Sequence, residues 1–393
     1  MDIVMTVQLP LEQVHPLAVP PALRDLQSRG VIHPVRTRVG HPAWLVTGYE
    51  EIRALIADPR LGRAHREPDK ASRLGDWMLF SGPMGDFDTE HDDEARVRAQ
   101  LQPHFAPGRM RALRPRVEAL TTDLLDELER HGSPADLQEA LAGPLPVLVI
   151  CELLGVPYED RDEFSKLSRA AGDILDPARS EQGLMELYEY GKRLVERKRD
   201  EAADDVISRM LQSGDLSDDE IAMHTMMLLF AGHETTVSQI GLGAACLLAD
   251  PGQWRALHDD PSLVPSAVEE ILRAPSLGGP GIPRYAREDL TVGEVTVRAG
   301  DLVILDIGAG NHDGAVFADP DRFDASRKDS PHLTFGFGAR YCIGAQLARI
   351  ELQAVFADLT RRFPDMRLAV PVEKLQRSPH SSTGVLLSLP VEW

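Results

Sequence analysis

Cysteine is scarce in this chain, and the few that occur are far apart. Only Cys151, Cys246 and Cys342 are present among 393 residues. Small proteins held together by disulfides need more cysteines at closer spacing, so no disulfide framework is expected. Reduced thiols at this low density suit a reducing cytosol. With 43% hydrophobic residues, the chain can instead bury a large apolar core.

A long hydrophobic run is also missing. The most apolar stretch, Pro144 to Val156, is too short to span a bilayer and contains Glu152. The first ten residues, Met1 to Pro10, lack the basic region and following apolar run of a signal peptide. We therefore expect a soluble, cytoplasmic protein with no membrane partner.

Positive charge is in deficit as well. Lys and Arg number 42 against 62 Asp and Glu, which gives a formal net charge of −20. Because nucleic-acid phosphates attract basic surfaces, nucleic acid is not expected as a partner, although a local basic patch is not excluded. We find no internal repeat, and the 29 prolines and 31 glycines are spread along the chain without marking a linker. Residues 1–393 are therefore expected to form a single domain.

The order of patterns along the chain predicts a mainly α protein with a small β region. We expect β-rich parts at about residues 31–48 and 284–306, together with a hairpin near the C-terminus. Helical patterns dominate from about 94 to 275 and again from 343 to 363. Residues 63–93 are polar and without period, which predicts a long loop of the kind that is usually functional or disordered.

One cysteine lies in a loop of unusual composition. The run Phe335-Gly336-Phe337-Gly338-Ala339-Arg340-Tyr341-Cys342-Ile343-Gly344 precedes a long amphipathic helix, whose N-terminal dipole favours a thiolate. The three glycines permit φ > 0 and a close approach of backbone N–H groups to the sulfur, and the two phenylalanines can shield it from water. Most free cysteines are buried core residues, but a core thiol would not need three flanking glycines. The loop therefore favours a metal centre.

This loop resembles the haem-binding loop of cytochromes P450, Phe-Gly-x-Gly-x-(His/Arg)-x-Cys-x-Gly, at every fixed position. The resemblance implies that Cys342 is the axial thiolate, and thus the metal ligand, of a haem. It also implies that four further loop residues bind the cofactor: Phe335, Gly336, Arg340 and Gly344. The resemblance covers essentially the whole chain and is strongest to soluble bacterial members, especially those of actinomycete secondary metabolism.

A second signal interrupts the apolar helical stretch between Ile221 and Asp250. Ala231-Gly232-His233-Glu234-Thr235-Thr236 brings a glycine, a carboxylate and two hydroxyls into that stretch. Glycine costs helix stability, and threonine can bond back to a carbonyl one turn earlier, so we expect a local opening of the helix that forms a groove. Taken alone, the pattern fits equally well a helix kink with an exposed polar face.

Beside the cysteine loop, this segment resembles the oxygen-binding groove of the same family. The resemblance implies that Glu234 and Thr235 are the catalytic acid–alcohol pair, which delivers protons during dioxygen activation. It also implies that Gly232 leaves room for dioxygen over the haem.

A third signal is a Glu-x-x-Arg pair on one helix face, Glu270 and Arg273. On a surface such a pair would contribute little to stability. The resemblance implies instead a buried pair, completed by Arg322 in Pro320-Asp321-Arg322-Phe323. We therefore predict a structural role for these residues, holding the scaffold behind the cysteine loop.

The two propionates of a haem need cationic or hydrogen-bonding partners. By resemblance, these are three arginines: Arg98, Arg284 and Arg340. In one departure from the family pattern, Glu94 stands where a histidine is usual, four residues before Arg98. Because a carboxylate cannot pair with a propionate, we expect that contact to be missing or supplied elsewhere, for example by His91 or His332.

The resemblance further implies a triangular, helix-rich prism around one haem b. Electrons would come from NAD(P)H through a separate ferredoxin or flavodoxin and its reductase, since the haem domain is expected to use all 393 residues. The implied activity is a monooxygenase that uses dioxygen and two electrons to oxidise a small organic molecule. Hydroxylation, epoxidation and oxidative cyclisation or coupling all remain open, and a monomer is expected.

The alternative is a haem protein that binds a ligand or senses a gas without turnover. Such a protein should lack the acid–alcohol pair, so the presence of Glu234 and Thr235 favours an enzyme. By topological position, the substrate pocket is expected to include five residues: Phe87, Met227, Leu277, Ile282 and Ser381. The run Gly278-Gly279-Pro280-Gly281 would keep that pocket open, which suits a bulky natural product.

Overall fold

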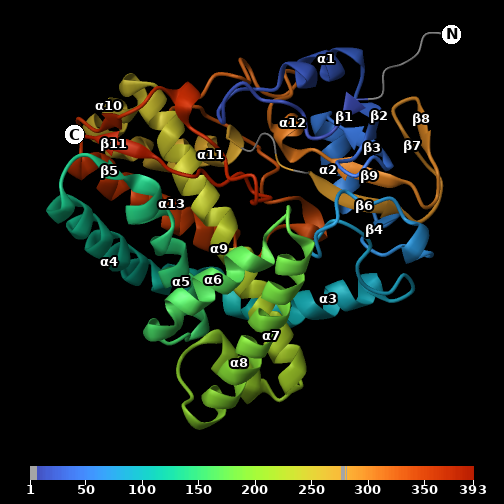
Figure 1. Cartoon of the computed structure of the whole chain (residues 1–393), viewed down its shortest axis with the longest axis horizontal. Helices are drawn as coiled ribbons and strands as arrows, with labels where there is room; N and C mark the ends of the chain where they lie inside the picture. Colours follow the sequence, from blue (N-terminus) through green and yellow to red (C-terminus); the bar gives the residue numbers. More distant parts are fainter. Residues whose placement is uncertain (1–6, 276–278, 280) are drawn as a thin grey trace. The chain divides into compact units, whose positions relative to one another are not determined.

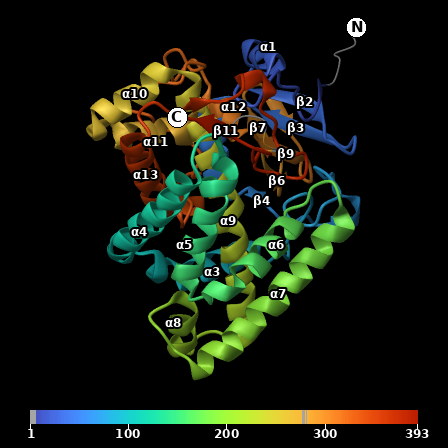
Figure 2. The same cartoon turned by 60° about the vertical axis from the view of Figure 1, so that its left-hand side comes forward.

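The computed structural model describes residues 7–275, 279 and 281–393 of the chain (Figures 1 and 2). These residues form two compact units. The first unit comprises Met1–Pro103 and Pro265–Ala345, and the second comprises His104–Val264 and Gln346–Trp393. Each unit therefore combines segments from distant parts of the sequence. That the whole chain acts as one domain stays a prediction.

A six-stranded sheet forms the β-rich part of the first unit, in the order β1-β2-β3-β9-β6-β4. Parallel pairing joins β1 to β2 and β3 to β9, and the other neighbours are antiparallel. A separate two-stranded antiparallel sheet pairs β7 with β8. The strand bounds are β1 Val7–Gln8, β2 Ile32–Arg36, β3 Pro42–Val46, β4 Leu61–Gly62, β6 Ile282–Ala286, β7 Leu290–Val292, β8 Val295–Val297 and β9 Leu302–Leu305.

Burial explains the position of these strands. All four residues of β9, Leu302–Leu305, are buried, as expected for a continuous apolar run at the centre of a sheet. The β2–β3 hairpin places buried Ile32 opposite buried Val46, and both join the core that packs against α2. The strands β2 and β3 lie within the predicted segment 31–48, and β7, β8 and β9 lie within 284–306. The strand β6 begins two residues before the second segment, and β1 and β4 were not predicted.

Short helices flank the sheet of the first unit. Their bounds are α1 Pro21–Arg29, α2 Tyr49–Ala57, α3 Glu90–Leu101, α11 Val264–Arg273 and α12 Ile307–Asn311, with 3-10 turns η1 Pro68–Lys70, η2 Gln102–Phe105 and η6 Gly338–Arg340. The helix α3 begins earlier than predicted, because acidic residues in its first turn interact favourably with the helix dipole. Residues 63–89 are otherwise loop apart from η1, as the sequence predicts.

The second unit is almost entirely helical. Figure 2 shows α5 and α6 beside the long helix α9, and α7 packs against α9 as well. Its helices are α4 Pro107–His131, α5 Pro144–Leu154, α6 Arg161–Ala171, α7 Pro177–Asp200, α8 Val206–Ser213, α9 Asp218–Ala249, α10 Pro251–Asp259 and α13 Ala345–Arg362, whose first residue belongs to the first unit. Short turns are η3 Gln138–Ala142, η4 Tyr158–Asp160, η5 Pro261–Leu263 and η7 Val372–Lys374.

A small antiparallel sheet, β10-β11-β5, closes the second unit, with bounds β5 Ala135–Asp136, β10 Arg367–Leu368 and β11 Pro390–Glu392. Near the C-terminus, a single bridge between Arg377 and Leu386 closes a loop. We call residues 378–385 the C-terminal loop. The hairpin predicted near the C-terminus is thus reduced to this bridge and to the pairing of β10 with β11.

The helix α9 starts at a capping box, in which Ser217 and Glu220 satisfy each other's backbone N–H groups. It is one continuous α-helix from Asp218 to Ala249, all of which is described. The predicted local opening at Gly232 to Thr236 is therefore wrong. The Thr235 hydroxyl does donate to the Ala231 carbonyl oxygen at 2.8 Å, as predicted. This bond does not interrupt the α-helix.

Within the described part of the chain, no helix combines the length and the apolar character that a membrane span requires.

Candidate active site

The cysteine loop of the first unit is a tight turn that depends on two glycines. Gly336 has φ +72° and Gly338 has φ +64°, a region that residues with a side chain rarely adopt. A Cβ atom on Gly336 would also lie 2.9 Å from the Arg340 carbonyl oxygen. The Cys342 N–H donates to the Phe335 carbonyl oxygen at 2.7 Å, which closes the loop. Gly344 has no positive φ, so the prediction is wrong for that glycine.

Cys342 itself is exposed, whereas the other two cysteines are buried. Burial raises the pKa of the Cys151 thiol to about 12, so that thiol stays protonated and inert. Cys342 lies just before Ala345, the first residue of α13, near the positive end of that helix. Phe335 is buried, whereas Phe337 is 38% exposed and stacks against the Arg53 guanidinium. That the two rings shield the sulfur of Cys342 from water stays a prediction.

Arg284 on β6 provides a test of whether this unit suits a haem propionate. Its side chain is buried, and its Nε atom has no hydrogen-bond partner among the described residues. Burial, followed by the repulsion of Arg63 and Arg340, lowers the pKa of Arg284 to about 9. Burial of a cation is costly; Glu94 and Glu90 offset part of that cost for Arg284, and an anionic group beside the guanidinium would offset more. The residues therefore fit a carboxylate-bearing cofactor.

The other two predicted propionate arginines are engaged with the protein. The Nη1 atom of Arg98 donates to the Tyr341 carbonyl oxygen at 2.8 Å, which ties α3 to the cysteine loop. Arg340 donates to the carbonyl oxygens of Ile56 at 3.1 Å and Leu61 at 2.9 Å. Both arginines therefore brace the loop, and their contact with a cofactor stays a prediction.

Glu94, the departure from the family pattern, has a clear structural role. It accepts from the Nε of Arg63 at 3.1 Å and from the Nε of Arg340 at 3.3 Å, so it neutralises two cations near Arg284. The expected substitutes have other partners: His91 contacts the Pro59 carbonyl oxygen at 2.9 Å, and His332 contacts Glu269 at 3.0 Å. Arg63 was not predicted to belong to this site. In the structure it is one of the two arginines that pair with Glu94.

The Glu-x-x-Arg pair is fully buried, as predicted. Glu270 and Arg273 both have 0% exposed side chains, and they form two hydrogen bonds of 2.7 and 2.8 Å. The third member is not Arg322, whose side chain is 65% exposed and faces Asp324. Arg327 takes that place, since its Nε donates to Glu270 at 3.0 Å. Arg322 contributes only its backbone carbonyl, which accepts from Arg273 and Arg327.

The acid of the predicted pair lies in the second unit. Glu234 on α9 accepts hydrogen bonds from the hydroxyls of Ser381 and Thr383 in the C-terminal loop, the latter at 3.1 Å. Burial raises the pKa of the Glu234 carboxyl, and the two hydroxyl donors oppose that rise. Such a carboxyl keeps a proton to a higher pH than an exposed glutamate does, which suits a general acid.

The neighbouring threonines face different surroundings. Thr235 is exposed, whereas Thr236 is buried, so the two hydroxyls point to different sides of α9. A Cβ atom on Gly232 would lie 2.9 Å from the Ile150 side chain of α5. This glycine is therefore required by the packing of α5 against α9, a reason that the sequence did not suggest. The predicted role of Gly232 in making room for dioxygen is not tested by that contact.

The residues predicted to line a substrate pocket are divided between the two units, so their role in a common pocket stays a prediction. Phe87 lies between two guanidinium groups, 4.5 Å from Arg66 and 4.0 Å from Arg287. Ile282 pairs with Leu305 in the sheet and packs against the core of the first unit. Ser381 holds Glu234, Met227 is half-buried on α9, and Leu277 lies outside the described residues.

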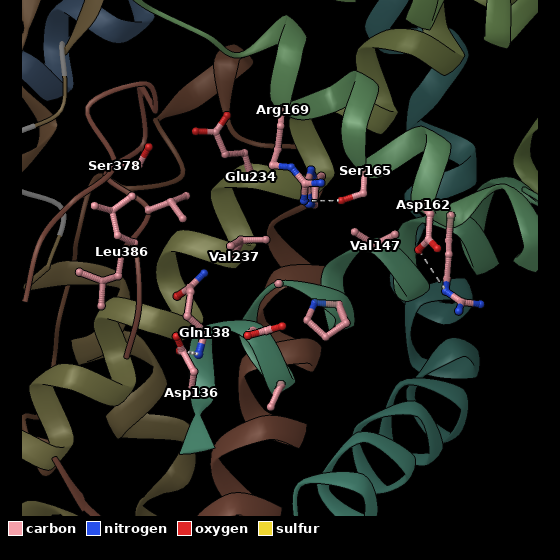
Figure 3. A pocket seen from close by; sticks show the side chains of 18 of the residues that line it. Asp136, Gln138, Val147, Asp162, Ser165, Arg169, Glu234, Val237, Ser378 and Leu386 are labelled. Carbon is pink, nitrogen blue, oxygen red and sulfur yellow. Dashed lines mark hydrogen bonds and ion pairs between the residues drawn. The ribbon is translucent and has the colours of Figure 1, made fainter. Parts of the chain in front are cut away.

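A cavity of about 1120 Å³ opens within the second unit, and Glu234 forms part of its wall. Figure 3 shows Glu234 and Val237 from α9 on one side, with Ser165 and Arg169 from α6 and Val147 from α5 on another. The C-terminal loop contributes Ser378, His380, Ser381 and Val385 to the same wall. Many of these side chains are polar, so water can occupy the cavity and reach the carboxyl.

Comparison with known proteins gives a consistent result. The family profile described as Cytochrome P450 matches residues 261–390. Pentalenolactone synthase of Streptomyces exfoliatus is 42% identical over 395 residues, which cover 98% of each chain. Mycinamicin IV hydroxylase/epoxidase of Micromonospora griseorubida is 38% identical over 391 residues, again 98% of each chain.

Solved structures agree. The substrate-free cytochrome P450 PimD, a pimaricin epoxidase, superposes with a TM-score of 0.89 at 38% identity and covers 99% of this chain and 100% of its own. The putative thioether synthase SgvP superposes with a TM-score of 0.91 at 32% identity, with the same coverage. The predicted fold class, mainly α with a small β region, is confirmed by these neighbours.

Proposed function

This chain belongs to the cytochrome P450 family, and from that premise we propose that it is a haem-thiolate monooxygenase of natural-product metabolism. The family and its named enzyme relatives make the chain an oxidoreductase, so a purely ligand-binding or gas-sensing role is set aside. One observation carries the proposal: the tight loop that presents Cys342 occurs in the same chain as a half-buried, hydrogen-bonded Glu234 next to an exposed Thr235.

The family uses a haem iron, and here we propose haem b. Cys342 is the residue to ligate the iron, and the buried guanidinium of Arg284 is the first choice for a propionate partner. Arg98 and Arg340 hold the loop around Cys342, and Glu94 keeps the surrounding arginines from repelling one another. When bound to a thiolate, haem supplies the activation of dioxygen.

The residues of α9 provide protons. Because burial raises the pKa of Glu234, its carboxyl keeps a proton to a higher pH than an exposed glutamate does. The Thr235 hydroxyl lies one residue along and is exposed, so it can both accept and donate a hydrogen bond. We assign the two residues to proton delivery, with Glu234 as the acid and Thr235 as the alcohol.

For the substrate, we propose a bulky natural product such as a macrolide. The relative PimD is described as a polyene macrolide antibiotic pimaricin epoxidase, and two other relatives are named pentalenolactone synthase and mycinamicin IV hydroxylase/epoxidase. We propose hydroxylation, epoxidation or oxidative ring closure of that substrate. Electrons would come from NAD(P)H through a separate ferredoxin or flavodoxin and its reductase, to a monomeric enzyme in the cytoplasm.

The test is a spectral titration followed by turnover. Purified holoprotein is titrated with a panel of terpenoid, macrolide and peptide metabolites, and compounds that perturb the haem spectrum are incubated with NAD(P)H, a ferredoxin and its reductase. We expect at least one compound to gain an oxygen atom or lose two hydrogens, as read by mass spectrometry. Binding without any NAD(P)H-dependent product across the panel would contradict the proposal.

A further inference from the structure

We propose that Ser381 and Thr383 of the C-terminal loop are positioning residues that fix the acidic proton of Glu234 on its Oε2 atom. This inference rests on the proposed role of Glu234 as the acid and adds how that acid is held. Both hydroxyls donate a hydrogen bond to the carboxyl of Glu234, and both bind the same oxygen, Oε1.

The direction of the Ser381 hydroxyl follows from its other contacts. Its oxygen accepts from the backbone N–H of Thr383 at 3.1 Å and from that of Val385 at 3.3 Å. Those donors occupy its lone pairs, so its single hydrogen is available for the carboxyl. The loop is itself pinned to α9, because the Ser238 hydroxyl donates to the Thr383 carbonyl oxygen at 2.7 Å. The donors are therefore preorganised.

Ser381 and Thr383 both point a hydroxyl hydrogen at Oε1. A proton bound to Oε1 would therefore face these two hydrogens and would find no acceptor for a hydrogen bond. The neutral acid must then carry its proton on Oε2. The close approach of Gly172, at the end of α6, confines this second oxygen. A Cβ atom on Gly172 would lie 2.6 Å from Oε2, so any larger residue would displace the carboxyl. Ser381 and Thr383 thus hold Oε1 of Glu234, and Gly172 lies close to Oε2.

Charged and titratable groups line the cavity around Glu234 from several elements. His233 is its neighbour on α9, Arg161, Asp162 and Arg169 lie on α6, and Arg179 lies on α7. On the other elements these groups are Glu127 and His131 of α4, Asp136 of β5, Glu139 of η3 and Tyr158 of η4. A contact of 3.0 Å between Asp173 and the His380 ring joins the chain just after α6 to the C-terminal loop, next to Ser381. A proton that leaves Oε2 can be replaced by one from solvent through this polar cavity, with no change in oxidation state.

The decisive variant is Ser381→Ala combined with Thr383→Val, measured on the holoenzyme. Infrared difference spectra report the carbonyl stretch of the protonated acid, identified by its loss in Glu234→Gln. Removing both donors should move this band to higher frequency and move its titration midpoint to higher pH, since the hydroxyls favour the charged form. Product formed per NAD(P)H should fall on the order of tenfold, the effect of one hydrogen bond to an ionisable group.

Ser378→Ala is the matched control. Ser378 belongs to the same loop and lines the same cavity, but its side chain makes none of the contacts that hold Glu234. The infrared band of the Glu234 acid, its titration midpoint and the product formed per NAD(P)H should equal those of the wild type in this variant. Gly172→Ala should instead reproduce the loss of coupling, because the added methyl group displaces Oε2.

The outcomes separate this inference from the proposed function. An unchanged infrared band in the double variant overturns the proposed role of Ser381 and Thr383, whether or not product formation changes. An equal shift in Ser378→Ala also overturns it, since the effect would then belong to the loop as a whole. If the wild type gives no product, the proposed function fails, but the band shift still tests the hydrogen bonds. Haem content and thermal unfolding of each variant show that the protein is folded.

Discussion

The Nε atom of Arg327 donates a hydrogen bond to Oε2 of Glu270 across 3.0 Å, and the side chain of Glu270 is completely buried. Glu270 also binds Arg273 through both of its oxygens and accepts from the Asp324 N–H at 2.9 Å. One carboxylate therefore neutralises two arginines within the first unit.

Glu270→Gln should destabilise the protein strongly, because it leaves Arg273 and Arg327 without their anionic partner in the interior. Breaking a buried charge pair typically costs about 3–5 kcal/mol of unfolding free energy. Denaturant unfolding of the haem-replete variant measures this loss, and low yield of haem-containing protein is the expected companion result. A variant as stable as the wild type would remove the structural role from this network.

Arg327 and Arg322 form a matched pair for the same question. Arg327→Ala should cost close to the value for Glu270→Gln, since its side chain is 13% exposed and meets Glu270 directly. Arg322→Ala should change the unfolding free energy by less than about 1 kcal/mol, as for other exposed ion pairs. If Arg322→Ala were the more destabilising variant, Arg322 would complete the buried Glu270–Arg273 pair, as the sequence predicts.

Replacement of Cys342 tests the metal ligand. Reduced wild-type protein with carbon monoxide should absorb near ~450 nm, as thiolate ligation requires, and Cys342→Ser should lack that band. Cys151→Ser and Cys246→Ser should keep it, because both thiols are buried and lie in the second unit. A persistent band in Cys342→Ser would show that another residue ligates the iron.

Arg284→Met should have opposite effects on the two forms of the protein. Without haem, the wild type carries a buried guanidinium with an unsatisfied Nε, so the variant apoprotein should unfold at a higher temperature. With haem, the variant loses a charge-assisted contact, and haem should dissociate about tenfold faster or more. Arg60→Met, which removes an exposed partner of Asp58, should leave both quantities unchanged. Equal haem retention in Arg284→Met would exclude Arg284 from propionate binding.

The cysteine loop could be predicted from the sequence because its contacts are local. The positive φ angles of Gly336 and Gly338 and the closure from Cys342 to Phe335 all lie within ten consecutive residues. The Glu270–Arg273 pair was equally accessible, since its residues are one helical turn apart.

The remaining partners depend on long-range folding. Ser381 lies 147 residues from Glu234, and nothing in its neighbourhood marks it as a donor to a carboxyl rather than a pocket residue. Arg322 and Arg327 are close in sequence, and nothing in their neighbourhood marks which guanidinium meets Glu270 in the folded protein. Glu94 was recognised as a departure, but its pairing with Arg63 required the fold of the preceding loop.

Buried histidines predict how stability depends on pH. Burial, with the nearby arginines as a further cause, lowers the pKa of His312 to about 3 from the ordinary value of 6.5. Between these values the unfolded chain binds the extra proton and the folded protein does not, so the unfolding free energy rises with pH and levels off above 6.5.

His312→Gln removes this contribution. Between pH 6.5 and pH 5, the wild type should lose about 2 kcal/mol more unfolding free energy than the variant does, at about 1.4 kcal/mol per pH unit. Urea unfolding of both proteins across that range gives the difference directly. Parallel curves for the two proteins would mean that His312 is protonated in the folded state.

Thr235→Ala tests the mechanism proposed for α9. The variant removes an exposed hydroxyl that donates to the Ala231 carbonyl within the same helix, so haem content, the carbon monoxide spectrum and substrate binding should all be retained. Proton delivery should become uncontrolled, because the exposed hydroxyl that follows Glu234 on α9 is lost, while Ser381 and Thr383 only hold the carboxyl. Oxidation of NAD(P)H should continue while product per electron falls and hydrogen peroxide accumulates, by an amount within the roughly 10²–10⁴-fold range of general acid catalysis.

Thr236→Ala is the control for that experiment, since it removes a hydroxyl of the same type from the buried side of α9, where its contact with the Gly232 carbonyl is 3.5 Å. Its coupling should stay near that of the wild type. Undiminished coupling in Thr235→Ala would assign proton delivery to another group, such as a hydroxyl of the substrate. If Thr236→Ala were uncoupled instead, the buried face of the helix, rather than the exposed one, would carry the protons.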